Sequence, residues 1–141
     1  DEEAREKMCE ASVIAGLAFT LPKTTSSHAC SFPLTNIYRI PHGEACGLTL
    51  DHFIRINAHG EDGERVEYLA HKLGFTDADA LADAVLELKR KMGLRCDLHD
   101  LNLSDEQIAE LVRISRHPNL YNNPVEITDE MLEEMYRTLA K

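Results

Sequence analysis

The chain has 141 residues and a mass of 15.9 kDa, which is enough for one domain with a hydrophobic core of its own. Fifteen Lys and Arg against 25 Asp and Glu give a formal net charge of -10 without a basic stripe, so we expect no nucleic-acid partner. The four cysteines stand far apart and form no CxxC pair, which argues against disulfides or zinc fingers and for a reduced, cytoplasmic protein.

Helical periodicity runs along the whole sequence, and no strand pattern of period two is found. We therefore predict an all-α fold of about seven helices in a single domain, residues 1–141. The first helix, Glu2 to Phe19, becomes apolar on all sides in its second half, which is typical of a helix that enters a core. The apolar stretch Ala11 to Leu21 is too short to span a bilayer, so no membrane partner is expected. The next two helices are predicted at His28 to Tyr38 and at Pro41 to about Asn57.

Four further helices follow, each marked by a capping residue or by a glycine at its end. The fourth helix carries Val66 to Leu73 and ends at Gly74, and the fifth carries Leu81 to Met92 and is capped by Thr76. In the sixth helix, Ser104 and Gln107 form a capping box before Ile108 to Val112. The last helix carries Leu132 to Leu139 and is capped by Thr128.

The segment from Ser27 to Leu50 holds two histidines, His28 and His42, which are separated by fourteen residues. On one unbroken helix they would lie about 21 Å apart, too far to share an ion. A helix of about nine residues followed by four extended residues, Ile37 to Ile40, would return the chain and let the two imidazoles meet. Imidazole suits Fe(II) and Zn(II), but a catalytic site needs about three protein ligands. Spacing alone favours a reading without a metal, in which His42 only follows a helix-starting proline and His28 is a residue of a helix cap.

The same segment resembles the signature of the iron-containing (group III) alcohol dehydrogenases. The resemblance is carried by His28, by PLT at Pro33 to Thr35, by Tyr38, by Pro41-His42-Gly43, by ASVIAGLAF at Ala11 to Phe19, and by Asn123-Pro124 with the helix after Thr128. It implies that the chain is the C-terminal part of the helical domain of the dehydroquinate synthase-like and iron alcohol dehydrogenase fold.

In that family one Asp and three His hold the active-site metal, and the last two His fall on His28 and His42. The resemblance places the other two ligands, and the NAD(P)-binding domain, upstream of Asp1. We therefore assign no catalytic and no cofactor-binding residue within this chain, and Asp51, Asp62 and His52 are not taken as substitute ligands. The implied cofactors are a divalent metal, Fe(II) before Zn(II), and NAD(P) in the complete enzyme.

The implied activity is the interconversion of a small alcohol and aldehyde by hydride transfer. The chain begins without an initiator Met, as an excised fragment does, and we expect the fragment alone to be inactive. Apolar surface that absent helices would cover favours homodimers or exchanged elements. Many members of the family carry a histidine where this chain has Phe32, and an aromatic residue before PLT resembles the phosphonoacetaldehyde-reductase-like branch.

Several other residues receive secondary interpretations. Phe32 and Tyr38 either line an apolar wall of the site or pack in the core. Lys23 or Arg39 would bind the acidic group of an anionic aldehyde. Cys30 and Cys46 are read as small apolar residues without a catalytic role. The remaining histidines are assigned to the surface or to packing: His52, His59, His71, His99 and His117.

Two alternatives stay open at this point. In the first alternative, the chain is a metal-free helical interaction module, and its PHG motif only starts a helix. In the second alternative, the chain belongs to an enzyme from another branch of the same superfamily, one that is glycerol-dehydrogenase-like or maleylacetate-reductase-like.

Overall fold

A computed structural model describes residues 1–141, and it is all-α, as predicted. It contains eight α-helices, two short 3₁₀ helices and no strand: α1 (Glu2–Ala18), α2 (Ser26–Tyr38), α3 (His42–Leu48), α4 (Leu50–Ala58), α5 (Gly63–Lys72), α6 (Ala78–Lys91), η1 (His99–Leu101), α7 (Asp105–Ser115), η2 (Pro118–Asn122) and α8 (Asp129–Ala140). None of these helices is both long enough and apolar enough to cross a bilayer.

The helix count exceeds the predicted seven because the third predicted helix is divided at Thr49. This residue leaves helical geometry, with φ -99° and ψ 0°, and its N–H donates to the carbonyl of Gly47. Its β-branched side chain is fully buried, and residues of this kind are restricted in a helix. The break lets α3 and α4 run in different directions, so α4 packs on α6 while α3 packs on α2.

Helix α2 runs through Pro33, although a proline in a helix interior cannot donate to the carbonyl four residues earlier. The helix ends where Arg39 adopts a left-handed conformation with φ 61° and donates its N–H to Thr35. The return to α3 therefore takes only three residues, 39–41, and the expected extended run from Ile37 is wrong in its first half. A sharp left-handed turn reverses the chain more abruptly than an extended segment does.

The capping residues were predicted with mixed success. Ser104 accepts a bond from the backbone N–H of Gln107, whose side chain bonds back, so the predicted capping box is confirmed. Thr128 caps α8, also as predicted. Thr76 does not cap α6, because Asp77 takes that position with a carboxylate that accepts from the third helical N–H. A carboxylate next to the positive helix end outcompetes a neighbouring hydroxyl.

One hydrophobic core holds α2, α3, α4, α7 and α8 together. Its largest fully buried members are Tyr136, Leu34, Leu48, Leu98, Leu111 and Leu132. Helix α6 joins α4 through a buried ion pair, in which the Lys89 ammonium lies 2.5 Å from an Asp51 oxygen and 3.0 Å from the carbonyl oxygen of Leu48. This core fixes the starts of α2 and α3 relative to each other.

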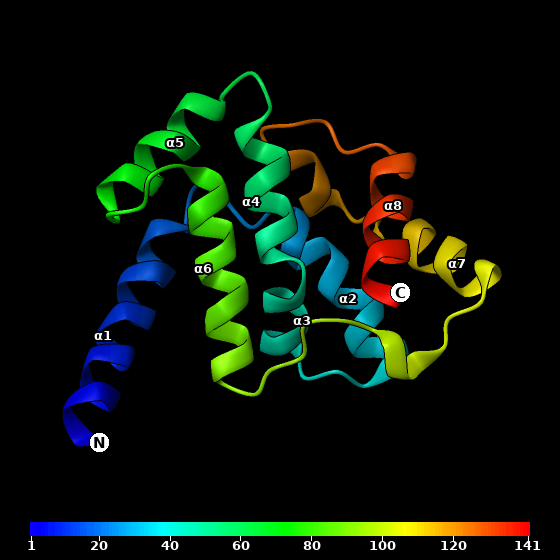
Figure 1. Ribbon diagram of the computed structural model, residues 1–141, viewed down its shortest axis with the longest axis horizontal. Helices are drawn as coiled ribbons and strands as arrows, with labels where there is room; N and C mark the ends of the chain where they lie inside the picture. Colours follow the sequence, from blue (N-terminus) through cyan, green and yellow to red (C-terminus); the bar gives the residue numbers. More distant parts are fainter.

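Helix α1 departs from the expectation that it enters a core. It buries no residue, and Figure 1 shows it extending away from the rest of the bundle. Val13, Ile14 and Leu17 are 64%, 59% and 72% exposed. The apolar second half of α1 therefore has no partner among residues 1–141.

Candidate metal centre

The two predicted histidines meet at the facing ends of α2 and α3. His28 lies in the first turn of α2, and His42 is the first residue of α3. Their Nε2 atoms are 3.2 Å apart, and the ring planes stand at 87°. His28 is half-buried and His42 is exposed, so the pair lies at the surface of the bundle, within reach of solvent.

The outer nitrogen of the His42 ring is held by a serine. The Ser31 hydroxyl donates to the carbonyl of His28 at 2.7 Å, which uses its one proton. At 3.3 Å from Nδ1 of His42, the same oxygen therefore acts as acceptor, and His42 carries its proton on Nδ1. This tautomer turns the Nε2 lone pair of His42 toward His28.

The outer nitrogen of the His28 ring faces the amide of Asn119, which is supplied by η2. The amide nitrogen donates to Thr24 Oγ1 at 2.7 Å and lies 3.3 Å from Nδ1 of His28. In this orientation Nδ1 accepts, and Nε2 of His28 donates its proton to Nε2 of His42. A half-turn of the amide would present its oxygen instead, move the proton of His28 to Nδ1, and free both Nε2 lone pairs.

Aromatic rings enclose the histidine pair on one side. Phe32 packs edge-on against His28 with a centroid distance of 4.9 Å, and its ring also lies 4.5 Å from that of His117. Burial lowers the pKa of His28, and the charges that His42 and His117 carry when protonated lower this pKa further. The site therefore favours a neutral His28 imidazole, which is the form that binds metals.

The secondary predictions divide between the site and the core. Phe32 lies at the histidine pair, whereas Tyr38 packs against the hydrophobic core, as the alternative interpretation held. His117, which was assigned to the surface or to packing, lies beside the pair. Lys23 and Arg39 are both exposed and make no ion pair.

The carboxylates that were not taken as ligands lie elsewhere. Asp51 is buried against Lys89, and Asp62 is exposed at the start of α5. Cys30 is buried in the core, where burial raises the pKa of its thiol to about 11, in keeping with the packing role assigned to it. Cys46 differs, because its sulfur lies 3.7 Å from Nε2 of His42.

Ser31 and Asn119 were not found by sequence reasoning, and Cys46 was considered but assigned no catalytic role. Ser31 is three residues after His28 and Cys46 is four residues after His42, so helical spacing alone places each on its histidine's face. Asn119 stands 91 residues from His28 in the sequence, and no local pattern connects them.

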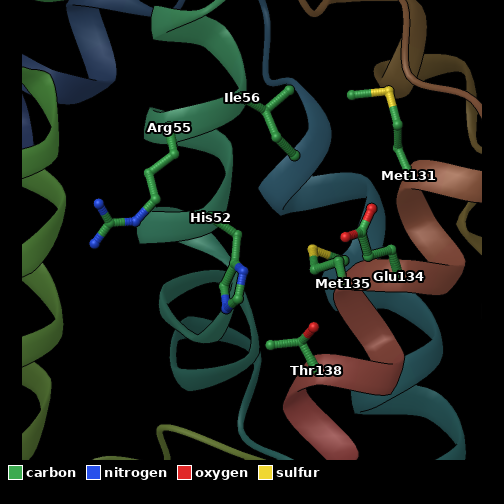
Figure 2. Close-up of a pocket in the computed structure, with 7 residues that line it drawn as sticks. All are labelled: His52, Arg55, Ile56, Met131, Glu134, Met135 and Thr138. Carbon is green, nitrogen blue, oxygen red and sulfur yellow. The ribbon is translucent and has the colours of Figure 1, made fainter.

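A separate cavity of about 270 Å³ lies between α4 and α8, and it shares no residue with the histidine pair. Figure 2 shows His52 pointing toward Thr138 and Met135, while the Arg55 guanidinium turns away from them. That guanidinium is engaged by Asp79 and Asp83, each at 2.7 Å. Burial lowers the pKa of His52, against an opposing effect of Asp51. The cavity thus gathers no set of convergent ligand atoms.

Comparison with known proteins gives a consistent result along the whole chain. Residues 1–140 match the model of the Fe-containing alcohol dehydrogenase family, C-terminal. A lactaldehyde reductase of Escherichia coli (strain K12) is 29% identical over 147 residues, which cover 98% of this chain and 38% of the relative. An alcohol dehydrogenase of Thermococcus barophilus is 30% identical over 142 residues, which cover 97% of this chain and 37% of the relative.

Solved structures agree with these matches. A sulfoacetaldehyde reductase from Bifidobacterium kashiwanohense, in complex with NAD⁺, superposes with a TM-score of 0.96 at 72% identity and covers 100% of this chain. An iron-containing alcohol dehydrogenase from Thermotoga maritima superposes with a TM-score of 0.79 at 30% identity and covers 99%. The chain spans 37% and 36% of these two proteins, so it corresponds to less than two fifths of each.

Proposed function

Because the chain belongs to the Fe-containing alcohol dehydrogenase family, we propose that His28 and His42 are two ligands of a divalent metal in an enzyme that interconverts a small alcohol and aldehyde. The observation that carries the proposal is the approach of the two Nε2 atoms to 3.2 Å. Fe(II) is our first choice of metal and Zn(II) our second, because both accept imidazole nitrogen.

The geometry of the pair fits such an ion. Ligand bonds of about 2.0–2.1 Å in a tetrahedral site place neighbouring nitrogens about 3.3 Å apart, close to the observed separation. Ser31 accepts the Nδ1 proton of His42, as a metal-binding histidine requires, and the Asn119 amide would do the same for His28 with its oxygen turned toward Nδ1.

The residues of the chain supply orientation and shelter. When bound, the metal offers a Lewis acid for a carbonyl group, and the nicotinamide offers hydride. Ser31 holds the lone pair of His42 toward its neighbour. Phe32 packs on His28 and lies nearly parallel to His42, at 21°, so it keeps both rings in place and limits the access of water from its side.

The substrate we propose is a small aldehyde with an acidic group. Its support is the 72% identity to a sulfoacetaldehyde reductase that was crystallised with NAD⁺, so we propose sulfoacetaldehyde and NAD(H). A sulfonate here takes the place of the phosphonate that the sequence resemblance suggested. A cation is needed to bind it, and Lys23 and Arg39 are the candidates, both without an acidic partner.

Steady-state kinetics of the complete protein test this choice of substrate. Alanine at both Lys23 and Arg39 should raise KM for sulfoacetaldehyde and leave KM for a neutral aldehyde of the same size unchanged. Equal KM values before and after the change would remove both cations from the proposal. A panel that includes glycerol and maleylacetate, with both nicotinamides, separates the other branches of the superfamily.

The remaining parts of the enzyme belong to segments outside residues 1–141. We propose that these segments carry the other metal ligands and the nucleotide-binding domain, so residues 1–141, a single partial domain, are inactive alone. The exposed apolar face of α1 supports contact with such segments or with a second copy in a homodimer. The free thiols support a reduced, cytoplasmic location.

Metal analysis of the complete protein tests the central proposal. We expect one divalent ion per chain, lost in His28→Ala and in His42→Ala. His99→Ala is the matched control, because His99 is exposed and pairs only with Asp97. A wild-type protein without metal would favour the alternative that α1 suggests, a metal-free helical interaction module. Variants that keep the metal would instead show that His28 and His42 are not its ligands.

A further inference from the structure

His117 places an unused hydrogen-bond donor next to the histidine pair. Its ring lies beside that of Phe32, with centroids 4.5 Å apart, and Phe32 in turn packs on His28 at 4.9 Å. A single aromatic ring therefore separates His117 from His28, although His117 belongs to the cap of η2 near the other end of the sequence. His117 is half-buried, so a small molecule in solution can reach its imidazole.

The bond at Nδ1 of His117 fixes which ring nitrogen carries the proton. Nδ1 accepts from the backbone N–H of Asn119 at 3.2 Å and so caps the start of η2. A neutral imidazole that accepts at Nδ1 carries its proton on Nε2. Nε2 of His117 has no hydrogen-bond partner within the chain, which leaves one ring N–H of the site free.

The loop before α2 brings a cation to the same side of the pair. Thr24 accepts from the Asn119 amide through Oγ1 at 2.7 Å and from the Asn122 amide through its carbonyl oxygen at 3.0 Å. These two bonds tie the loop to η2, so Lys23 lies one residue from the attachment point. Lys23 makes no ion pair, and its charge adds to the donor that His117 offers.

The other histidines outside the pair do not offer this arrangement. His59 and His71 bond to backbone carbonyls, and His99 pairs with Asp97. His52 lies in the separate cavity between α4 and α8. His117 alone places a free ring N–H beside the pair.

We propose that His117 recognises the acidic group of the substrate by donating its Nε2 hydrogen to a sulfonate oxygen. A sulfonate carries a negative charge and three acceptor oxygens, so it binds several donors at once. In a two-carbon aldehyde the carbonyl and the sulfonate lie only a few Å apart. The carbonyl faces His28 and His42, while the sulfonate extends past Phe32 to His117. The inference rests on the proposed function and adds the residue that distinguishes an anionic aldehyde from a neutral one.

Binding of ethanesulfonate to the complete protein tests this contact without chemistry. His117→Asn keeps an oxygen that accepts from the N–H of residue 119 and caps η2, but its shorter side chain no longer reaches the sulfonate. Isothermal titration should show binding weaker by about tenfold or more, as expected for a lost hydrogen bond to a charged group. His117→Gln, whose amide nitrogen extends as far as Nε2, should bind more tightly than His117→Asn. His99→Asn is the matched control and should keep the wild-type affinity.

Steady-state kinetics with two aldehydes gives an independent readout. In His117→Asn, kcat/KM for sulfoacetaldehyde should fall about tenfold or more beyond any fall for propanal. Helical circular dichroism of each variant confirms that it has folded. An equal fall for both aldehydes, or wild-type affinity of His117→Asn for ethanesulfonate, would overturn the inference and leave the metal site intact. A wild-type protein that does not reduce sulfoacetaldehyde would instead contradict the proposed function.

Discussion

Two polar clusters in this bundle differ in how their atoms are satisfied. Asp51 and Lys89 join α4 to α6 in the interior, and the ammonium has both a carboxylate and the carbonyl of Leu48 as partners. His28 and His42 join α2 to α3 at the surface, where their outer nitrogens have Asn119 and Ser31 as partners and their Nε2 atoms face each other, with the Cys46 sulfur near that of His42. The polar atoms of the first cluster bind one another, and their role is to hold α4 against α6. The second directs two ligand atoms at one point, where a proton or a cation can bind them both.

The largest expected effect concerns the cluster of Asp51 and Lys89. Lys89→Met removes one charge and leaves the Asp51 carboxylate buried without its partner, which should cost about 3–5 kcal/mol of unfolding free energy. Urea denaturation followed by circular dichroism measures the loss. The double variant Asp51→Leu, Lys89→Met should recover most of it, since both charges are then gone. A single variant as stable as the wild type would show that water reaches the pair.

The next effect concerns the partner of His42. Ser31→Ala removes the acceptor for Nδ1–H and should weaken zinc binding about 10- to 100-fold, the usual range for such partners. Ser26→Ala is the matched control, because Ser26 is equally buried on α2 and its hydroxyl has no partner. Isothermal titration of the complete protein with Zn(II) compares them. Equal losses in both variants would point to packing rather than to the orientation of the ring.

These examples also show what the sequence could and could not predict. The helices followed from apolar periodicity and caps, which are local, and the Ser104 box and the Thr128 cap were found in this way. The break at Thr49 was missed, because a single β-branched residue is a weak local signal and its full burial is visible only in the fold.

The candidate site divides in the same manner. His28 and His42 were selected by a motif within one short segment, and the structure brings their rings into contact, while their role as ligands stays a prediction. Asn119 was not predictable, since it reaches the site from η2 through tertiary packing. Cys46 lies four residues after His42, the spacing that places two side chains on one face of a helix, but the sequence did not show which way that face of α3 points.

A substitution at Asn119 is expected to have a smaller effect, and it should raise zinc affinity rather than lower it. Asn119→Asp offers only acceptor oxygens, which favour the proton on Nδ1 of His28 and so present its Nε2 lone pair. Zinc affinity should therefore rise about tenfold, whereas Asn119→Ala should lower it. The same titration measures both variants. Weaker binding by Asn119→Asp would contradict the role of residue 119 in setting the tautomer of His28.

The smallest effect is the dependence of stability on pH without metal. The pKa of His28 is lowered in the folded state, so the unfolded chain takes up the proton more readily. The contribution of His28 to the free energy of unfolding is complete above the unfolded pKa of about 6.5, and it is lost as the pH falls below that value. Urea unfolding at pH 7.5 and 5.5 should show a smaller decrease for His28→Gln than for the wild type. His52→Gln corrects for the second histidine with a lowered pKa.

The position of a metal ion in a crystal of the complete protein would show whether His28 and His42 are ligands. Anomalous scattering recorded on both sides of the absorption edge of the bound metal locates that ion without reference to the ligands. If both histidines are ligands, one peak should lie within bonding distance of Nε2 of both His28 and His42. A peak at another site, or an ion that binds only one of the two rings, would contradict their role as ligands.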